Sequence, residues 1–331
     1  MLDTYGRRIE YLRVSVTDRC NLRCFYCMPS KGVPEKFSHG DMMTYEEMSR
    51  AIGCATSLGF RKVRVTGGEP LVRKGLTGFL ATLSRMARVS EVTLTTNGTL
   101  LEENLEGLWQ SGVRRLNISL DTLKPERFSR ITRGGNLATV WNGLQAALER
   151  GFSPVKLNTV AMRGLNDDEW EALANLSVEY PVHVRFIELM PLGSDLGTGS
   201  GARQRWEKMF VPAAEVQDRL GKAGRLEPIE VVGSGPARYF RLPGALGTVG
   251  FISAMSCHFC FSCNRLRLTS NGRLNPCLSG DVEIDLLGAM RRGASDEEVK
   301  VLIEHAVLLK PLEHHMTCGE GGRRLMSRLG G

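Results

Sequence analysis

The sequence lacks several features that would set it apart from an ordinary globular protein. It has no block of like charges and no internal repeat, and its apolar content is too high for a disordered chain. Its first residues contain no unbroken apolar stretch of the kind that a secretory signal peptide needs, which predicts a cytoplasmic protein. Aromatic residues make up only 7% of the chain, too few for a platform on which nucleic-acid bases stack.

One long segment has no charged side chain, yet it does not predict a membrane helix. Residues 242–264 contain no Asp, Glu, Lys or Arg and are numerous enough to cross a bilayer. The same residues include a proline, glycines, a histidine and three cysteines, which a membrane helix would not combine. We therefore expect no membrane partner.

The nine cysteines are the most informative residues. An odd number of thiols without an export signal favours metal binding or catalysis over a disulfide framework. Lysine and arginine outnumber aspartate and glutamate by 43 to 36, and they are scattered rather than gathered in a tract. This balance fits a small polyanionic ligand as well as it fits nucleic acid.

Short β-branched segments alternate with amphipathic segments over the first part of the chain. Strands are predicted at residues 11–17, 62–66, 91–96, 114–120, 154–160 and 182–187, and helices at residues 44–58, 76–88, 101–110, 137–150 and 167–180. This alternation predicts an α/β fold with parallel strands, in an open doubly wound sheet or in a full or partial barrel. The active site is expected at the carboxyl ends of the strands.

The alternation breaks at the glycine-rich residues 193–201, a flexible connection suited to a lid or to a link with a second module. We place a domain boundary near residue 220. This divides the chain into a larger domain, residues 1–220, and a smaller domain, residues 221–331, which we expect metal to hold together in part.

The first cysteine triplet, Cys20, Cys24 and Cys27, follows the first predicted strand with three and then two residues between its members. Thiolates this close can hold three corners of a 4Fe–4S cluster and leave the fourth iron open. An open iron can chelate S-adenosylmethionine (SAM), which then performs radical chemistry. A zinc site or three unrelated thiols is the alternative, although zinc takes four ligands and favours paired Cys-x2-Cys units.

The second cysteine triplet, Cys260, Cys263 and Cys277, has two and then thirteen residues between its members. Three ligands again imply an iron with an open position. A structural zinc stays open as an alternative here, because Cys257 or His258 is available as a fourth ligand.

Two further features extend the first motif. An aromatic residue, Tyr26, precedes the last cysteine, and a Gly-Gly-Glu-Pro segment, residues 67–70, ends the second predicted strand. Together with the triplet they resemble the radical SAM superfamily, whose GGEP motif binds the amino group of the cofactor. The resemblance implies a partial (β/α)6 TIM-type barrel with a smaller C-terminal cluster-binding domain, and two 4Fe–4S clusters.

The end of the chain adds a second resemblance. Residues 264–267, which read Asn-Arg-Leu-Arg, follow Cys263, and the chain ends in Gly330 and Gly331. Both features resemble the GTP 3′,8-cyclase family of molybdenum cofactor biosynthesis. The resemblance runs from about Tyr11 to the last residue and implies the conversion of GTP to (8S)-3′,8-cyclo-7,8-dihydroguanosine 5′-triphosphate.

The resemblance also implies which residues hold each ligand. SAM would contact Gly68, Glu69, Ser119, Met190 and the backbone of Tyr26. GTP would contact Arg13, Arg64, Thr95, Lys156, Arg265, Leu266 and Arg267, and Arg185 joins them as a further cation on a predicted strand. The catalytic set would comprise Cys20, Cys24, Cys27, Arg265, Arg267, Gly330 and Gly331.

The course of the reaction and its partners follow from the same resemblance. Guanine would bind the open iron of the second cluster, so that the deoxyadenosyl radical meets the C3′ hydrogen of the ribose. The C3′ radical would attack C8, and an electron and a proton would complete the product. We expect an external electron donor, and cyclic pyranopterin monophosphate synthase, the next pathway enzyme, as product acceptor. The protein is expected as a monomer or homodimer without a nucleic-acid partner.

Two other functions stay open at this point. A peptide maturase of the radical SAM superfamily would share the first triplet and the GGEP motif, but residues 264–267 and the terminal glycines favour a triphosphate. A non-catalytic zinc-binding or nucleic-acid-binding protein would fit the basic charge. Such a zinc protein would be colourless, whereas two iron–sulfur clusters would make the protein brown.

Overall fold

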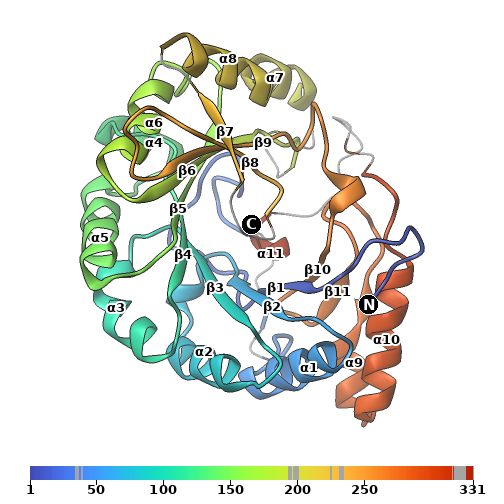
Figure 1. Ribbon diagram of the computed structural model, residues 1–331. Helices are drawn as coiled ribbons and strands as arrows, with labels where there is room; N and C mark the ends of the chain where they lie inside the picture. Colours follow the sequence, from blue (N-terminus) through green and yellow to red (C-terminus); the bar gives the residue numbers. More distant parts are fainter. Residues whose placement is uncertain are drawn as a thin grey trace.

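Six parallel strands that alternate with helices form the body of the protein. The computed structural model describes residues 1–33, 37–38, 40–192, 196, 201–223, 226–230, 235–314, 316 and 326–330. The strands are β1 (Tyr11–Ser15), β2 (Lys62–Thr66), β3 (Glu91–Thr96), β4 (Arg115–Ser119), β5 (Val155–Ala161) and β6 (Val182–Glu188), each paired in parallel with the next. Helices α1 (Tyr45–Ser57), α2 (Leu76–Arg85), α3 (Leu101–Gln110), α5 (Leu137–Arg150) and α6 (Trp170–Glu179) lie outside them (Figure 1). The predicted strands and helices are confirmed, with ends that differ by a few residues.

One helix of this region escapes the sequence prediction. Helix α4 (Pro125–Thr132) has only eight residues, and two of its buried side chains, Phe128 and Ile131, are its whole apolar pattern. Pro125 opens it at a position where a missing N–H costs nothing. A pattern this short cannot be separated from a turn by periodicity.

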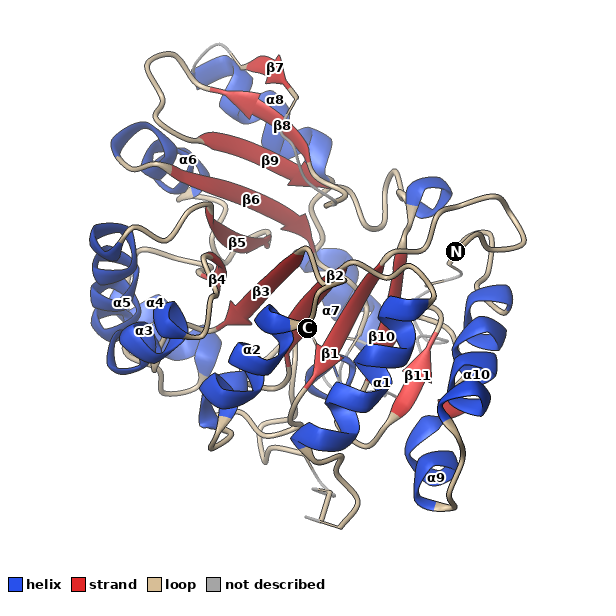
Figure 2. Ribbon diagram, turned by 60° about the horizontal axis from the view of Figure 1, so that its bottom comes forward, coloured by secondary structure: helices blue, strands red, loops and turns tan. Residues whose placement is uncertain are grey.

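The C-terminal part of the chain extends the sheet at both edges. Strands β9 (Thr248–Ile252), β8 (Arg238–Arg241) and β7 (Glu227–Ile229) follow β6, while β10 (Arg265–Leu268), β11 (Arg273–Asn275) and β12 (Ile284–Asp285) precede β1 (Figure 2). Both β9 and β10 run parallel to their neighbour in the barrel. The partial barrel with a smaller C-terminal part is thus confirmed. The boundary at residue 220 stays a prediction.

The remaining helices differ in where they lie. Helix α8 (Ala213–Ala223) packs against α6, β6 and β9, and α9 (Leu286–Arg291) and α10 (Asp296–Leu308) lie beside α1. Helix α7 (Ala202–Met209) contacts the segment after β6, because Trp206 donates to the carbonyl oxygen of Leu189. Helix α11 (Met326–Leu329) instead lies inside the ring of strands. In the described part of the chain, no helix has both the length and the apolar character that crossing a membrane requires.

The strands are apolar on one face and polar on the other. The face toward the helices belongs to the main hydrophobic core and carries Val14, Val63, Val65, Leu94, Leu116, Ile118, Leu157 and Val184. Since strand side chains alternate, the other face points into the barrel and carries Arg13, Arg64, Thr95, Asn117, Lys156 and Arg185. A purely structural barrel fills this space with branched apolar side chains. The polar interior therefore indicates a ligand site.

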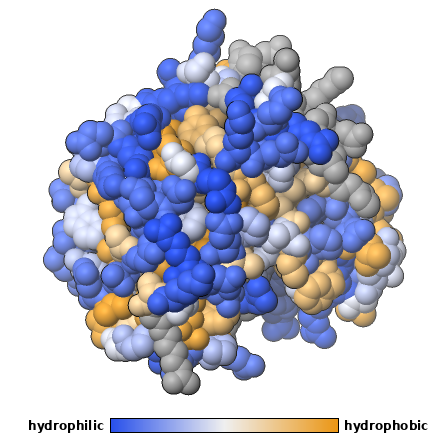
Figure 3. All heavy atoms as spheres, turned by 90° about the horizontal axis from the view of Figure 1, so that it is seen from above, coloured by the Kyte–Doolittle hydropathy of each residue, from blue (hydrophilic) through white to orange (hydrophobic). Residues whose placement is uncertain are grey.

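The outer surface has the composition of an ordinary solvent-exposed face. In Figure 3, hydrophilic side chains cover most of the visible face, with smaller hydrophobic areas between them. Scattered apolar atoms of this kind are normal on protein surfaces. The concentration of unusual charge is inside the barrel.

Candidate active site

The first cysteine triplet lies in the loop after β1, at the carboxyl ends of the strands. Cys20, Cys24 and Cys27 are half-buried free thiols. Burial raises the pKa of Cys20 to about 11, and burial together with the neighbouring Cys27 and Asp121 raises the pKa of Cys24 well above its ordinary value. Coordination to a metal deprotonates a thiol, so a metal centre would stabilise the thiolate forms that burial disfavours. The donor set fits three ligands of an iron–sulfur cluster.

A buried carboxylate holds the aromatic residue of this loop. The hydroxyl of Tyr26 donates to Asp121 at 2.6 Å, and the other oxygen of Asp121 accepts the N–H of Val160 at 2.8 Å. Burial raises the pKa of Asp121 to about 6, although the hydrogen bond from Tyr26 opposes the rise. Asp121 thereby links the cysteine loop to the ends of β4 and β5.

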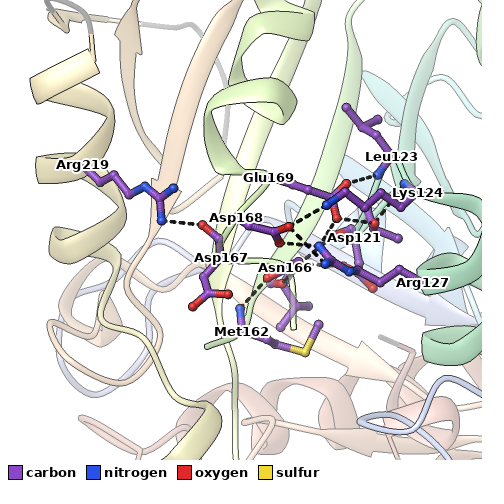
Figure 4. A network of polar contacts seen from close by, with 12 residues as sticks. Asp121, Leu123, Lys124, Arg127, Met162, Asn166, Asp167, Asp168, Glu169 and Arg219 are labelled. Carbon is purple, nitrogen blue, oxygen red and sulfur yellow. Dashed lines mark hydrogen bonds and ion pairs between the residues drawn. The ribbon is translucent and has the colours of Figure 1, made fainter. Parts of the chain in front are cut away.

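A polar network supports Asp121 from behind (Figure 4). The side-chain amide of Asn166 donates to the carbonyl oxygens of Asp121 and Val160, at 2.8 Å each. The carboxylate of Glu169 accepts the N–H of Leu123 at 2.7 Å and is paired with Arg127. The loops that follow β4 and β5 are therefore fixed by buried hydrogen bonds rather than by packing alone.

The Gly-Gly-Glu-Pro segment packs its backbone directly against the loop after β1. A Cβ atom on Gly68 would lie 2.2 Å from the carbonyl oxygen of Arg19, so no side chain fits there. Glu69 is fully buried and accepts hydrogen bonds from Leu71, Thr96 and Asn97. Burial raises its pKa to about 7. Since protein donors already surround this carboxylate, its direct contact with SAM stays a prediction.

The other predicted SAM residues lie at the same end of the barrel. Ser119 is the last residue of β4, and Met190 follows the end of β6 by two residues. Both are half-buried, as is Tyr26. The structure thus brings the predicted SAM residues to one rim with the first triplet, and their contacts with SAM stay predictions.

Arginines from three neighbouring strands form a row across the barrel interior. Arg13 of β1 is the register partner of Arg64 on β2 and of Arg267 on β10. Because residues in register on paired strands face the same side, the three side chains lie next to one another. Burial, followed by Arg267 and Arg64, lowers the pKa of Arg13 well below its ordinary value.

Two more cations adjoin this row. Burial, Arg185 and Arg64 lower the pKa of Lys156 to about 8, and Arg185 donates to the side-chain oxygen of Asn117 at 2.7 Å. Burial also lowers the pKa of Arg185 and of Arg267 to about 10. Like charges held this close in a poorly solvated space favour a polyanionic ligand. We call Arg13, Arg64, Lys156, Arg185, Arg265 and Arg267 the cation row.

Buried polar atoms without hydrogen-bond partners lie in the same space. Within the described residues, Thr95 Oγ1, Arg185 Nε and Arg265 Nε are buried and have no hydrogen-bond partner. Buried polar atoms are rarely left in this state, so they indicate a missing polar ligand. Leu266 differs from its neighbours because its fully buried side chain belongs to the hydrophobic core. Only its backbone is available to GTP.

The second cysteine triplet lies at the opposite end of the barrel strands. Cys260 and Cys263 precede β10, and Cys277 follows β11, which runs antiparallel to β10. Burial acts to raise the pKa of Cys263, but Lys310, Arg265 and hydrogen bonds lower it to about 7. The cation row therefore lies between two cysteine triplets.

The N-terminal segment is hydrogen-bonded to the second triplet through Arg7. Arg7 is buried and paired with Asp3 at 2.6 Å. Its guanidinium also donates to the carbonyl oxygens of Cys260, Pro311 and Leu312, at 2.7, 2.7 and 2.9 Å. In the described part of the chain, no group of three His, Cys, Asp or Glu side chains is arranged to hold a single metal ion.

The tail of the chain enters the barrel and meets the cation row. The carbonyl oxygen of Gly330 accepts hydrogen bonds from Arg13 at 2.9 Å and Thr66 at 3.1 Å, and that of Leu329 accepts one from Arg267 at 3.2 Å. Gly330 has a φ of +81°, and a Cβ atom there would lie 2.7 Å from Thr66 Cγ2. Glycine is therefore required at this position. The other predicted tail residue, Gly331, lies outside the described residues.

Known proteins are similar to the chain over its whole length. A model described as the radical SAM superfamily matches residues 14–177, and a model described as Molybdenum Cofactor Synthesis C matches residues 182–316. The GTP 3′,8-cyclase of Pelotomaculum thermopropionicum is 51% identical and that of Heliobacterium modesticaldum 52% identical, with 100% of each chain covered. The chain belongs to the GTP 3′,8-cyclase family. Membership of the radical SAM superfamily implies a 4Fe–4S cluster and SAM.

A solved structure supports the fold of this family member. Streptococcus suis SuiB bound to S-adenosylmethionine superposes with a TM-score of 0.60 at 15% identity, over 84% of this chain and 63% of that chain. The chain thus spans less than two thirds of SuiB. At this identity the likeness shows the fold alone.

Sequence reasoning missed a buried carboxylate at the carboxyl end of β6. Glu188, the last residue of β6, accepts hydrogen bonds from the backbone N–H groups of Ala213, Met255 and Ser256, at 2.8, 2.6 and 2.8 Å. It is 1% exposed. Glu188 holds the segment before the second triplet against the strand that leads to Met190. The sequence alone does not single out Glu188, because its hydrogen-bond partners lie far from it along the chain.

We expect Glu188→Gln to lower the free energy of unfolding by about 3 kcal/mol, because an amide presents an N–H group to donors that a carboxylate satisfied. Urea unfolding measures this change. The matched control is Glu215→Gln, which removes a half-exposed ion pair with Arg163 and should cost less than about 1 kcal/mol. Equal effects of the two changes would contradict the role given to Glu188.

Proposed function

We propose that the protein catalyses the first step of molybdenum cofactor biosynthesis, the radical cyclisation of GTP to (8S)-3′,8-cyclo-7,8-dihydroguanosine 5′-triphosphate. The observation that carries this proposal is the cation row between two cysteine triplets at opposite ends of the barrel. A nucleoside triphosphate bound by the row would lie between the two triplets. The relatives at 51% and 52% identity, named GTP 3′,8-cyclase, support this substrate.

Each cysteine triplet would hold one 4Fe–4S cluster. Cys20, Cys24 and Cys27 fit the first, with SAM between it and the rim made by Gly68, Ser119 and Met190. When bound, this cluster and SAM supply the deoxyadenosyl radical that abstracts hydrogen. Cys260, Cys263 and Cys277 fit the second cluster, which would offer an open iron to guanine.

The residues of the barrel bind and orient the substrate. The guanidinium groups of the cation row would hold the triphosphate by charge-assisted hydrogen bonds, which fix its orientation as well as its position. Thr95 and Arg265 have unused buried polar atoms, so they would supply the remaining directional contacts. The closed polar interior would keep water from a substrate radical, because the helices and the tail surround it.

The tail would complete the site on one side of the triphosphate. The carbonyl oxygen of Gly330 occupies a hydrogen-bond donor of Arg13, and that of Leu329 occupies one of Arg267. These two contacts fix how the guanidinium groups are turned. We infer that the carbonyl groups of Leu329 and Gly330 position these arginines for catalysis.

The partners of the reaction lie outside the chain. An external donor would supply electrons, and cyclic pyranopterin monophosphate synthase would accept the product. A cytoplasmic monomer or homodimer fits these partners. A nucleic-acid partner is not proposed, because the cation row lies inside the barrel and not on a surface that a duplex can reach. A peptide maturase is not proposed either, since a row of cations suits a triphosphate better than a peptide.

The test is a turnover assay. After anaerobic reconstitution with iron and sulfide, the brown protein is given GTP, SAM and dithionite, and the products are identified by mass spectrometry. We expect 5′-deoxyadenosine together with a cyclised product that retains the triphosphate, and neither product from a Cys24→Ser control. Deoxyadenosine without GTP conversion would contradict the substrate, and the absence of both products would contradict the radical chemistry.

Lys156 gives a prediction about pH. Its pKa of about 8 lies below the ordinary 10.5, so its charge is lost as pH rises through this value. A bound triphosphate favours the charged form, so GTP binding takes up a proton in this range. Calorimetric affinity should fall up to about tenfold between pH 7.5 and pH 9. Lys156→Arg should remove most of this dependence because a guanidinium stays charged, and an unchanged slope in that variant would argue against it.

The tail gives a second prediction. Deletion of Gly330 and Gly331 should stop GTP conversion while both clusters still assemble, as measured by iron per chain. Gly330→Ala should also lower turnover by about tenfold or more, because its Cβ would collide with Thr66. The control is Gly6→Ala, which has a φ of +77° and meets nothing within 4 Å. Full activity of the truncated protein would refute the role of the tail.

A further inference from the structure

A buried lysine touches the second cysteine triplet and has no part in the function described above. Lys310 lies two residues beyond α10 and is 3% exposed. Its ammonium group donates to the carbonyl oxygens of Arg265 at 2.9 Å and Pro276 at 2.8 Å, and it lies close enough to Cys260 and Cys263 for its charge to act on both thiols. An ammonium group has three N–H donors, and these two carbonyl oxygens use two of them.

The two carbonyl acceptors belong to the two chain segments that carry cysteine ligands. Arg265 follows Cys263 by two residues, and Pro276 directly precedes Cys277. Lys310 therefore bridges the start of β10 and the end of β11, and its hydrogen bonds fix the separation of these two cysteines. A methionine in its place would leave both carbonyl oxygens without this donor.

Lys310 also brings positive charge to the second triplet. Arg7, which reaches the carbonyl oxygen of Cys260, is paired with Asp3 at 2.6 Å. Lys310 has no carboxylate within ion-pair distance among the described residues. The first triplet has the opposite surroundings, because the carboxylates of Glu69 and Asp121 lie close to it.

We propose that Lys310 is the counter-cation of the second cluster, which spaces Cys263 and Cys277 and raises the reduction potential of the cluster that they hold. This inference rests on the proposed second cluster. A cluster on three thiolates is negative, and reduction adds one electron without a proton, so the reduced form is more negative still. A buried cation close to the ligand sulfurs stabilises the reduced form more than the oxidised form.

The experiment measures the second cluster alone. Cys20, Cys24 and Cys27 are changed together to serine in the full chain, so that reconstituted iron reports the second triplet. Lys310→Gln, Lys310→Met and Lys310→Arg are then made in this parent. The control is Lys300→Met, which removes the same charge from α10, where the half-buried Lys300 pairs with Glu297. Iron per chain and the midpoint potential, from a redox titration followed by electron paramagnetic resonance, are the readouts.

We expect Lys310→Gln and Lys310→Met to shift the midpoint to more negative values or to lose the cluster, while Lys310→Arg and Lys300→Met stay near the parent. An unchanged midpoint in fully loaded Lys310→Gln would overturn the proposal. Loss of iron from Lys310→Arg as well as from Lys310→Gln would also overturn it, because the shape of lysine and not its charge would then matter. A parent that binds no iron would overturn the proposal that the second triplet holds a cluster. Iron in the parent is therefore measured before Lys310 is changed.

Discussion

The confinement of positive charge inside the barrel is the constraint on which the rest of the site depends. Arg13, Arg64 and Arg267 are held side by side by the register of three parallel strands, and Lys156 and Arg185 adjoin them. These groups lose hydration and lie close to other positive charges. The pKa values of Arg13, Lys156, Arg185 and Arg267 are lowered in consequence. Packing of the sheet and of its apolar outer face must offset the free-energy cost of burying these charges. The free energy of the folded protein is lowest when an anion lies among these buried cations.

The polar residues around the barrel show how the fold maintains that arrangement. Glu69, Asp121 and Glu188 each stand at the end of a strand, are buried, and accept hydrogen bonds from neighbouring strands and loops. Together they fix the loops at the carboxyl ends of β2, β4 and β6. Parallel strands bring these ends to one edge, so a few buried carboxylates are enough to order the whole rim.

Most of the site that faces the barrel could be predicted from the sequence, and the supports behind it could not. Arg13, Arg64 and Lys156 fall on strands with a clear alternation, so their common direction follows from strand geometry. The two triplets are recognisable because their spacing is local. Glu188 and Lys310 act through partners that the fold, not the sequence, brings near. The placing of β10 next to β1 has the same cause, because pairing between distant strands leaves no periodic signal.

The bridge that Arg7 makes has a consequence for the order of events in folding. This residue joins the first segment of the chain to Cys260 and to Leu312, across separations of 253 and 305 positions. Contacts of this range form slowly, since the chain between them must already be arranged. On the ribosome, the loop of the first triplet emerges together with β1, whereas the second triplet waits for nearly the whole polypeptide. The two proposed cluster sites are therefore completed at different times, and the second is complete only when synthesis is almost finished.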